Sequence, residues 1–361
     1  LIQHLKELRL HCNLKAEDTI FYFTTCGWMM WNWVVSSLAV GATLVLYDGN
    51  PFYPAPDALL KMADELDITV FGTSAKYIAG LEEAEIKPGE ISDFPKLEVI
   101  TSTGSPLSDE SFEYVYREWK KDVQLSSIAG GTDIVSCFVL GSPTLPVHRG
   151  EIQCKGLGMD VDCFDENGKS VVEQQGELVC KTAFPSMPIY FWNDPEGKKY
   201  HSAYFEVYPG IWHHGDYIRI SEHGGITMFG RSDATLNPSG VRIGTSEIYS
   251  VVENMDEITD SVVVGQHYDD DERVILFVKL QTGVKLGDDL KTKIKKLIRS
   301  NCSPRHVPAV ILETKDVPYT LNGKKVEVAV KKIIHGQDVK NKDALANPES
   351  LENFMDRKEL N

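Results

Sequence analysis

The chain has 361 residues, enough for about two domains, and its 42% hydrophobic and 25% charged residues are typical of a globular protein with a substantial core. A formal net charge of −16 argues against a nucleic-acid-binding protein, because such a protein presents a basic surface. Any phosphate of a ligand must therefore be bound by arginines and lysines placed locally. The seven cysteines include no Cys-x-x-Cys pair, which argues against a disulfide framework or zinc site and predicts reduced thiols in the cytosol.

Residues 1–10 have the pattern of an amphipathic helix without the flanks of a signal peptide, and we expect the natural start of the protein to lie upstream. The most apolar window, residues 26–47, has no charged residue over 22 positions, and a membrane-spanning helix needs about 20 apolar residues. Asn32 and Gly41 interrupt this window, and residues 43–47 have the short, β-branched character of a strand. We therefore favour a buried helix, a turn at Gly41 and a central strand over a membrane span.

Strands and helices are expected to alternate over the next part of the chain. The expected strands lie at residues 69–73, 97–102 and 123–128, and the expected helices at residues 56–66, 76–84 and 108–120. This alternation predicts an α/β fold with a mostly parallel sheet covered by helices. Such sheets bind ligands in the loops beyond the carboxyl ends of their strands.

Two loops of this region stand out, at residues 101–106 and 129–133. Each follows an expected strand, so parallel pairing places both at the same edge of the sheet. Either loop alone could be an ordinary tight turn, but the two together indicate a binding site. Neither contains a Walker motif or a G-x-G-x-x-G pattern.

Residues 150–219 have short expected strands and turns, which predict a small β-rich, barrel-like subdomain. It ends with His213 and His214 shortly before Asp216, but neighbouring side chains on a strand point to opposite faces, so we do not expect a metal site there. After residue 233, expected strands at residues 261–264, 274–280 and 310–313 and helices at residues 290–301 and 326–334 predict a compact α+β domain. The polar tail, residues 337–361, is expected to pack poorly.

Residues 226–250 carry Arg231 and Arg242 on turns formed by glycines and a proline. Basic side chains on turns suit an anionic ligand, and a break between ordered elements suits a hinge, although an ordinary polar connection remains an alternative. The segment closely resembles the hinge motif of the adenylate-forming ligases, a family that includes acyl-CoA synthetases, adenylation domains and luciferases. The matching residues are Gly230-Arg231-Ser232-Asp233, Gly240-Val241-Arg242 and Glu247-Ile248.

The resemblance implies a fold, a set of ligands and a two-step reaction. Residues 1–232 would be the C-terminal part of the AMP-binding large domain, with the sheet at 1–149 and the β-rich subdomain at 150–219, and residues 233–336 would be the α+β lid. The ligands would be ATP, CoA and a carboxylic acid, with Mg²⁺ as cofactor. The acid would form an acyl adenylate and then a thioester, and the lid would turn about Asp233 between the two half-reactions.

The resemblance also assigns nucleotide contacts in the large domain. Gly104-Ser105-Pro106 matches the adenine-contacting loop. Thr132, which follows Gly131, matches the threonine that hydrogen-bonds the α-phosphate. Asp133 takes the place of the usual glutamate that binds Mg²⁺, with a side chain one methylene shorter. Asp216 matches the aspartate that binds the ribose hydroxyls, as a carboxylate with two acceptor oxygens can do.

In the hinge and lid, Arg231 would contact ribose and phosphate, and Arg242 would face the phosphates during adenylation. Ser239 and Gly240 would line the tunnel for the pantetheine arm of CoA. Lys324 matches the lysine that stabilises the adenylation transition state, because it directly follows the glycine of the family's Gly-Lys pair. The catalytic set implied is therefore Lys324, Arg242 and Thr132.

The acyl pocket implied by the resemblance is formed by Trp28, Met29, Met30, Thr103 and Gly130. Acetate-using members carry a tryptophan where this chain has Gly130, and a glycine leaves room for a longer acid. The wider pattern, which includes residues 127–134, 210–216, 230–238 and 318–331, resembles the branch of the family that joins acetoacetate to CoA. The alternatives are a ligase for another short-chain or β-keto acid, and a non-catalytic relative that binds nucleotide or CoA.

The family's phosphate-binding loop, with its lysine, is expected upstream of residue 1. We therefore expect the 361 residues alone to form adenylate poorly or not at all. The ligands expected are small molecules, with no nucleic acid and no membrane span, and the sequence leaves the oligomeric state open.

Overall fold

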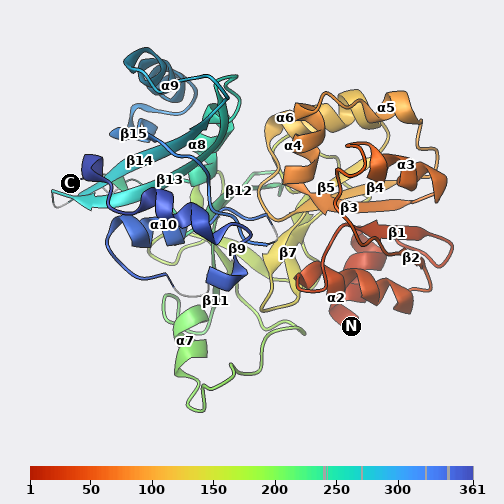
Figure 1. Cartoon of the computed structure of the whole chain (residues 1–361). Coiled ribbons are helices and arrows are strands. Elements are labelled where there is room, and N and C mark those ends of the chain that lie inside the picture. The colour runs from red at the N-terminus through yellow and green to blue at the C-terminus, as the bar shows by residue number, and fades with distance from the viewer. Residues whose placement is uncertain (239–240, 242, 270, 322, 340–341, 361) are drawn as a thin grey trace. The chain divides into compact units, whose positions relative to one another are not determined.

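The computed structural model describes residues 1–238, 241, 243–269, 271–321, 323–339 and 342–360 (Figure 1). The chain forms two compact units, residues 1–214 with 218–228 and residues 215–217 with 229–361. The division at residues 228 and 229 lies close to the hinge motif, which predicts a boundary between residues 232 and 233.

A five-stranded parallel sheet is the centre of the first unit. Its order is β2-β1-β3-β4-β5, with bounds β1 (Thr19–Tyr22), β2 (Thr43–Val45), β3 (Val70–Ser74), β4 (Val99–Thr103) and β5 (Gln124–Ser127). The expected α/β class with a parallel sheet is confirmed.

Helices cover both faces of this sheet, because successive side chains of each strand point to opposite sides. Phe21 and Phe71 lie in one core with the helices α3 (Ala58–Glu65), α4 (Ala75–Glu83), α5 (Pro88–Ile91) and α6 (Asp109–Tyr114). Their neighbours Ile20 and Val70 point into a second core with α2 (Met29–Val35) and the π-helical turn Glu7–His11, which follows α1 (Ile2–Lys6). Figure 1 shows α4 and α6 on the opposite side of the sheet from α2.

The apolar window, residues 26–47, divides as expected into a helix, a turn and a strand. A 3-10 turn (Ser36–Ala39) follows α2, and Gly41 has a positive φ of 94° before β2 begins. The expectation of a central strand was wrong, because β2 pairs only with β1 at the edge of the sheet and its side chains are exposed or half-buried. Among the described residues, no helix is long and apolar enough to cross a membrane.

The β-rich part of the chain forms two antiparallel sheets, where a single barrel-like subdomain was expected. One sheet has the order β6-β7-β8, and the other has the order β12-β11-β10-β9. Their bounds are β6 (Ala129–Gly131), β7 (Ser136–Leu140), β8 (Cys154–Lys155), β9 (Val161–Phe164), β10 (Gln175–Cys180), β11 (Trp212–Ile220) and β12 (Ile226–Arg231). A short helix, α7 (Lys198–Tyr204), precedes β11, and the fully buried Trp212 lies in the shared core.

The second unit contains a three-stranded sheet of order β13-β14-β15, with bounds β13 (Ile258–Tyr268), β14 (Asp271–Leu280) and β15 (Val310–Glu313). One face packs against α8 (Thr245–Val252) and α9 (Asp288–Asn301), through side chains such as Leu276. The other face packs against α10 (Glu327–Ile334), through side chains such as Phe277. The expected α+β arrangement is observed.

The tail was expected to pack poorly, and the structure corrects this expectation. Leu345, Leu351, Phe354 and Leu360 are buried in the core beneath α10. The rings of Phe354 and Phe277 meet edge to face with centroids 4.9 Å apart. A few apolar residues at irregular spacing therefore anchor a tail whose composition is polar.

Candidate functional site

The loops after β4 and β5 lie together at the carboxyl edge of the parallel sheet, as expected. Thr103, the last residue of β4, donates a hydrogen bond from Oγ1 to the carbonyl oxygen of Ile128, at 2.7 Å, and so joins the two loops. Gly104 has a positive φ of 100°, and a β-carbon there would lie 3.9 Å from Cζ2 of Trp28. The structure thus brings the expected adenine loop next to an expected acyl-pocket residue, with Ser105 and Pro106 exposed.

Glycine is required at two positions of β6, because groups of the surrounding chain approach both positions closely. A β-carbon on Gly130 would lie 2.1 Å from the carbonyl oxygen of Ser136 in the neighbouring strand β7. A β-carbon on Gly131 would lie 2.6 Å from the imidazole ring of His214. Because neither position has room for a methyl group, β6 can approach β7 and β11 only with glycine.

Thr132 and Asp133 follow β6 and are both exposed. The hydroxyl of Tyr204 donates a short hydrogen bond to Oδ2 of Asp133. The Tyr204 ring stacks on Trp212 with centroids 3.7 Å apart, so the donor is held on a rigid aromatic support. In the described part of the chain, no group of three or more His, Cys, Asp and Glu side chains is placed to hold a metal ion.

Sequence reasoning missed Tyr204. It lies 71 residues from Asp133 and belongs to no motif that would associate the two. Its position at the end of α7, in ring contact with Phe191, Tyr200 and Trp212, is an indication visible only once those rings are brought together.

The expected acyl-pocket residues have different environments. Trp28 and Thr103 lie beside the loop at Gly104, whereas Met30 is 1% exposed and belongs to the core under the sheet. Met29 is half-buried. The missing side chain of Gly130 faces the backbone of β7.

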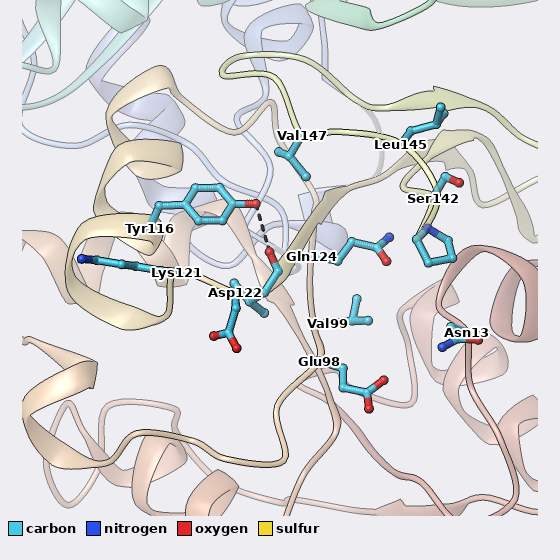
Figure 2. Close-up of a pocket in the computed structure, with 12 residues that line it drawn as sticks. Asn13, Glu98, Val99, Tyr116, Lys121, Asp122, Gln124, Ser142, Leu145 and Val147 are labelled. Carbon is cyan, nitrogen blue, oxygen red and sulfur yellow. Dashed lines mark hydrogen bonds between the residues drawn. The ribbon is translucent and has the colours of Figure 1, made fainter.

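A pocket of about 490 Å³ lies at the opposite edge of the sheet, where β4 and β5 begin (Figure 2). Glu98, Asp122 and Gln124 line it, and Tyr116 donates a hydrogen bond to the carbonyl oxygen of Val123 at 3.1 Å. None of the expected site residues lines this pocket.

A second group of expected residues lies in the second unit, around Arg231. Its guanidinium lies between Asp216, with Nη1 3.4 Å from Oδ1, and Asp233, with Nε 3.4 Å from Oδ1. Gly215 has a positive φ of 80°, and a β-carbon there would lie 2.8 Å from Nη2 of Arg231. Glycine at this position therefore leaves the space that the guanidinium occupies. The expected ribose-binding carboxylate and the expected hinge carboxylate are thus joined through one arginine.

Lys324 lies on a tight hairpin, residues 319–325, which we call the lysine loop. Gly323 has a positive φ of 74°, and the backbone N–H of Thr320 donates to the carbonyl oxygen of Lys324 at 2.8 Å. The Lys324 side chain is exposed. Partial burial of its ammonium, assisted by the positive charge of Arg231, lowers the pKa of Lys324, and Asp216 opposes that shift.

The tail holds the lysine loop through hydrogen bonds. The backbone N–H of Ala346 donates to the carbonyl oxygen of Tyr319 at 2.8 Å, and that of Leu321 donates to Ala344 at 3.0 Å. The side-chain oxygen of Asn347 accepts from the N–H of Tyr319 at 2.9 Å. These contacts were missed because the tail was expected to be loose.

Three expected residues, Ser239, Gly240 and Arg242, lie outside the described residues. The next helix, α8, is capped at its N-terminus by Glu247, whose carboxylate accepts a hydrogen bond from the backbone N–H of Gly244 at 2.8 Å.

Comparison with known proteins agrees with the resemblance of the motifs. Residues 2–191 match the model of the family described as AMP-binding enzyme. The chain is 57% identical to the acetoacetyl-coenzyme A synthetase of Rhizobium meliloti (strain 1021) over 360 residues, covering 100% of this chain and 55% of that protein. It is 53% identical to the acetoacetyl-CoA synthetase of Mus musculus, covering 100% of this chain and 54% of that protein.

Among solved structures, acetoacetyl-CoA synthetase from Streptomyces lividans matches with a TM-score of 0.91 and 43% identity, over 98% of this chain and 55% of that chain. An anthranilate CoA ligase with bound anthranoyl-AMP shares the fold at a TM-score of 0.74 and 17% identity, over 90% of this chain and 61% of that one. The chain therefore spans about half the length of the curated relatives it matches. On the match of the family model and of these relatives along the chain, it belongs to the AMP-binding enzyme family.

Proposed function

We propose that the whole protein, meaning a chain of the relatives' full length that contains these residues, is an AMP-forming acid–CoA ligase for acetoacetate. It would convert acetoacetate, ATP and CoA into acetoacetyl-CoA, AMP and diphosphate by way of an acyl adenylate. The observation that carries the proposal is the 57% identity to an acetoacetyl-CoA synthetase along this entire chain. We also propose that it works in the cytosol, as the unpaired cysteines suggest.

In the first half-reaction, a carboxylate oxygen of the acid attacks the α-phosphorus of ATP, and diphosphate leaves. Negative charge gathers on the phosphoryl oxygens, so aligned cations and donors lower the barrier. We assign the ammonium of Lys324 and the guanidinium of Arg242 as the cations that stabilise that negative charge. The hydroxyl of Thr132 is assigned as donor to the α-phosphate.

Asp133 suits the magnesium ion that such reactions require. Mg²⁺ is commonly held by one or two carboxylates together with substrate phosphates and water, so one exposed carboxylate meets the need of the protein side. Tyr204 donates to Oδ2 of Asp133 and so orients the carboxylate that would hold the ion. When bound, the ion would offset charge on the phosphates.

Asp216 and Arg231 together provide groups that suit the binding of a nucleotide. A carboxylate with two acceptor oxygens can bind both ribose hydroxyls, and the adjacent guanidinium can bind a phosphate oxygen. Asp233 contacts the same arginine, so the proposed pivot and the proposed ribose contact share one partner. In the second half-reaction we propose that the lid turns about Asp233, so that CoA reaches the adenylate along Ser239 and Gly240.

The test separates the two half-reactions of the whole protein. In Lys324→Ala, acetoacetate-dependent exchange of diphosphate into ATP should fall on the order of 10²–10³-fold, the usual cost of removing one group that stabilises transition-state charge. Thioester formation from supplied acetoacetyl adenylate should persist, because Lys324 has no part in it. Lys285→Ala, which removes another exposed lysine of the same unit, is the control and should leave both half-reactions unchanged. Equal loss in both half-reactions, or loss in neither, would contradict the assigned role.

A further inference from the structure

Two consecutive lysines at the end of the lysine loop have opposite environments. Lys324 is exposed, whereas the side chain of Lys325 is only 15% exposed. The Lys325 ammonium donates to Oδ1 of Asp260 at 2.8 Å, to the carbonyl oxygen of Ser261 at 2.6 Å and to Oε1 of Glu253. An ammonium has three N–H donors, so all of them are satisfied inside the protein.

Aromatic rings complete this enclosure. The Lys325 ammonium lies 4.2 Å from the ring centroid of Tyr249, within the range of a cation–π contact, and 5.9 Å from that of Tyr319. The hydroxyl of Tyr319 donates to Asp260 at 2.9 Å, so the lysine and the tyrosine share one carboxylate. Burial would lower the pKa of Lys325, but Glu253 and Asp260 outweigh it and the pKa is raised, so the group stays charged.

The two ends of the lysine loop are fixed by this enclosure. Tyr319 and Lys325 face each other across the hairpin as an antiparallel bridge, and both side chains contact Asp260 on β13. Glu253, at the end of α8, accepts from the same ammonium, so the end of this helix is also linked to the lysine loop. Lys324 directly precedes the anchored Lys325 in the chain, so little freedom of the backbone remains between the anchor and the Cα of Lys324.

We propose that Lys325 is a positioning residue that holds Lys324 in place for the adenylation step. The inference rests on the proposed role of Lys324 and goes beyond it, because the N–H donors of the Lys325 ammonium are all used by groups within the protein. A buried ammonium that only stabilised the core would affect every activity of the protein alike. One that positions Lys324 affects adenylation alone.

The main variant is Lys325→Met in the whole protein, which keeps the stem beside Tyr249 and deletes the charge. The exchange of diphosphate into ATP should fall on the order of 10²-fold in kcat, the cost of a misplacement of about 1 Å. The KM for ATP and thioester formation from supplied acetoacetyl adenylate should not change. Lys293→Met, which breaks the ion pair between Lys293 on α9 and Glu257, is the matched control and should change neither half-reaction.

Because Lys325→Met removes the ion-pair partner of Glu253 and Asp260, its folding is checked by thermal unfolding. Tyr319→Phe supplies a milder variant that keeps the ammonium and removes only the hydroxyl on Asp260. It should lower the exchange rate in the same direction and by less, with thioester formation unchanged.

A double variant separates this inference from the proposed function. In a Lys324→Ala background, Lys325→Met should cause no further loss of exchange, since it acts only through Lys324. Losses that multiply, or equal loss in both half-reactions, would overturn the positioning role while leaving that of Lys324 intact. If Lys324→Ala itself has no effect on exchange, the proposed function fails first.

Discussion

The β6 loop, residues 129–133, and the lysine loop, residues 319–325, each present a polar side chain to solvent but are held in different ways. In the β6 loop, neighbouring groups approach Gly130 and Gly131 so closely that no β-carbon fits. In the lysine loop, buried charges and hydrogen bonds from the tail hold the backbone. The β6 loop should therefore be destabilised when atoms are added, and the lysine loop when donors or acceptors are removed.

The largest effect expected is that of Gly130→Ala on the first unit. Its methyl group would meet the Ser136 carbonyl oxygen at 2.1 Å, and backbone cannot swing aside as a flexible side chain can. The free energy of unfolding should fall by about 3 kcal/mol, the upper part of the usual range for overpacking. Denaturant unfolding measures it, with Gly27→Ala as control, because a β-carbon there makes only ordinary contact at 3.8 Å. Equal stability of the two variants would contradict the steric account of β6.

Deletion should be the damaging change in the lysine loop. Asn347→Ala removes the acceptor for the N–H of Tyr319 and the donor to the carbonyl oxygen of Val317. We expect the free energy of unfolding of the second unit to fall by about 2 kcal/mol, because partly buried groups lose their partners. Asn301→Ala, at the exposed end of α9, is the control and should cost less than about 0.5 kcal/mol. If both variants unfold alike, the tail does not hold the loop.

The β6 loop is also supported by a hydrogen bond, from Tyr204 to Asp133. Tyr204→Phe removes the donor to Asp133 while the ring keeps its stack on Trp212. The loss should be about 1 kcal/mol in stability, together with a higher Mg²⁺ requirement for adenylation by the whole protein. Tyr200→Phe, in the same aromatic cluster, tests whether loss of any hydroxyl there has this effect. An unchanged Mg²⁺ requirement in Tyr204→Phe would show that the tyrosine does not orient Asp133.

The smallest effect expected is a dependence of the stability of the first unit on pH. His11 donates from Nδ1 to the carbonyl oxygen of Gly141 at 2.7 Å and accepts at Nε2 from the N–H of Leu157 at 3.0 Å, so the neutral ring is the one that fits. Burial, assisted by Lys6, lowers the pKa of His11 from 6.5. The unfolded chain then takes up the proton first, and stability is lost as the pH falls below about 6.5.

The loss attributable to His11 should reach no more than about 0.8 kcal/mol on going from neutral pH to pH 6. Unfolding curves of the unaltered chain and of His11→Gln at both pH values measure it. The variant should show the smaller decrease in stability, and identical pH dependence would rule out His11 as the cause.

Local patterns account for what could be predicted. The alternation of β-branched strands and helices follows from short-range periodicity, and the strand at residues 310–313 is observed with its expected bounds as β15. The motif residues around Gly104, Thr132 and Arg231 are each next in sequence to the turn that exposes them. The local structure of these elements could be predicted because it depends on residues close together in the sequence.

Long-range partners could not be predicted, because they depend on topology. Tyr204 lies 71 residues from Asp133, and Asn347 lies 28 residues from Tyr319. The edge position of β2 is likewise set by the order of strands. Of two adjacent lysines, Lys325 is the buried one, and its partners are Asp260 on β13 and Glu253 at the end of α8.

The most direct test of the account is a comparison of acids with the whole protein. The measurement is kcat/KM for AMP formation with acetoacetate, acetate, butyrate and 3-hydroxybutyrate, in the presence of ATP, Mg²⁺ and CoA. We expect acetoacetate to be the best substrate and its turnover to be lost in Lys324→Ala. Preference for acetate, or AMP formation that does not depend on any of these acids, would contradict it.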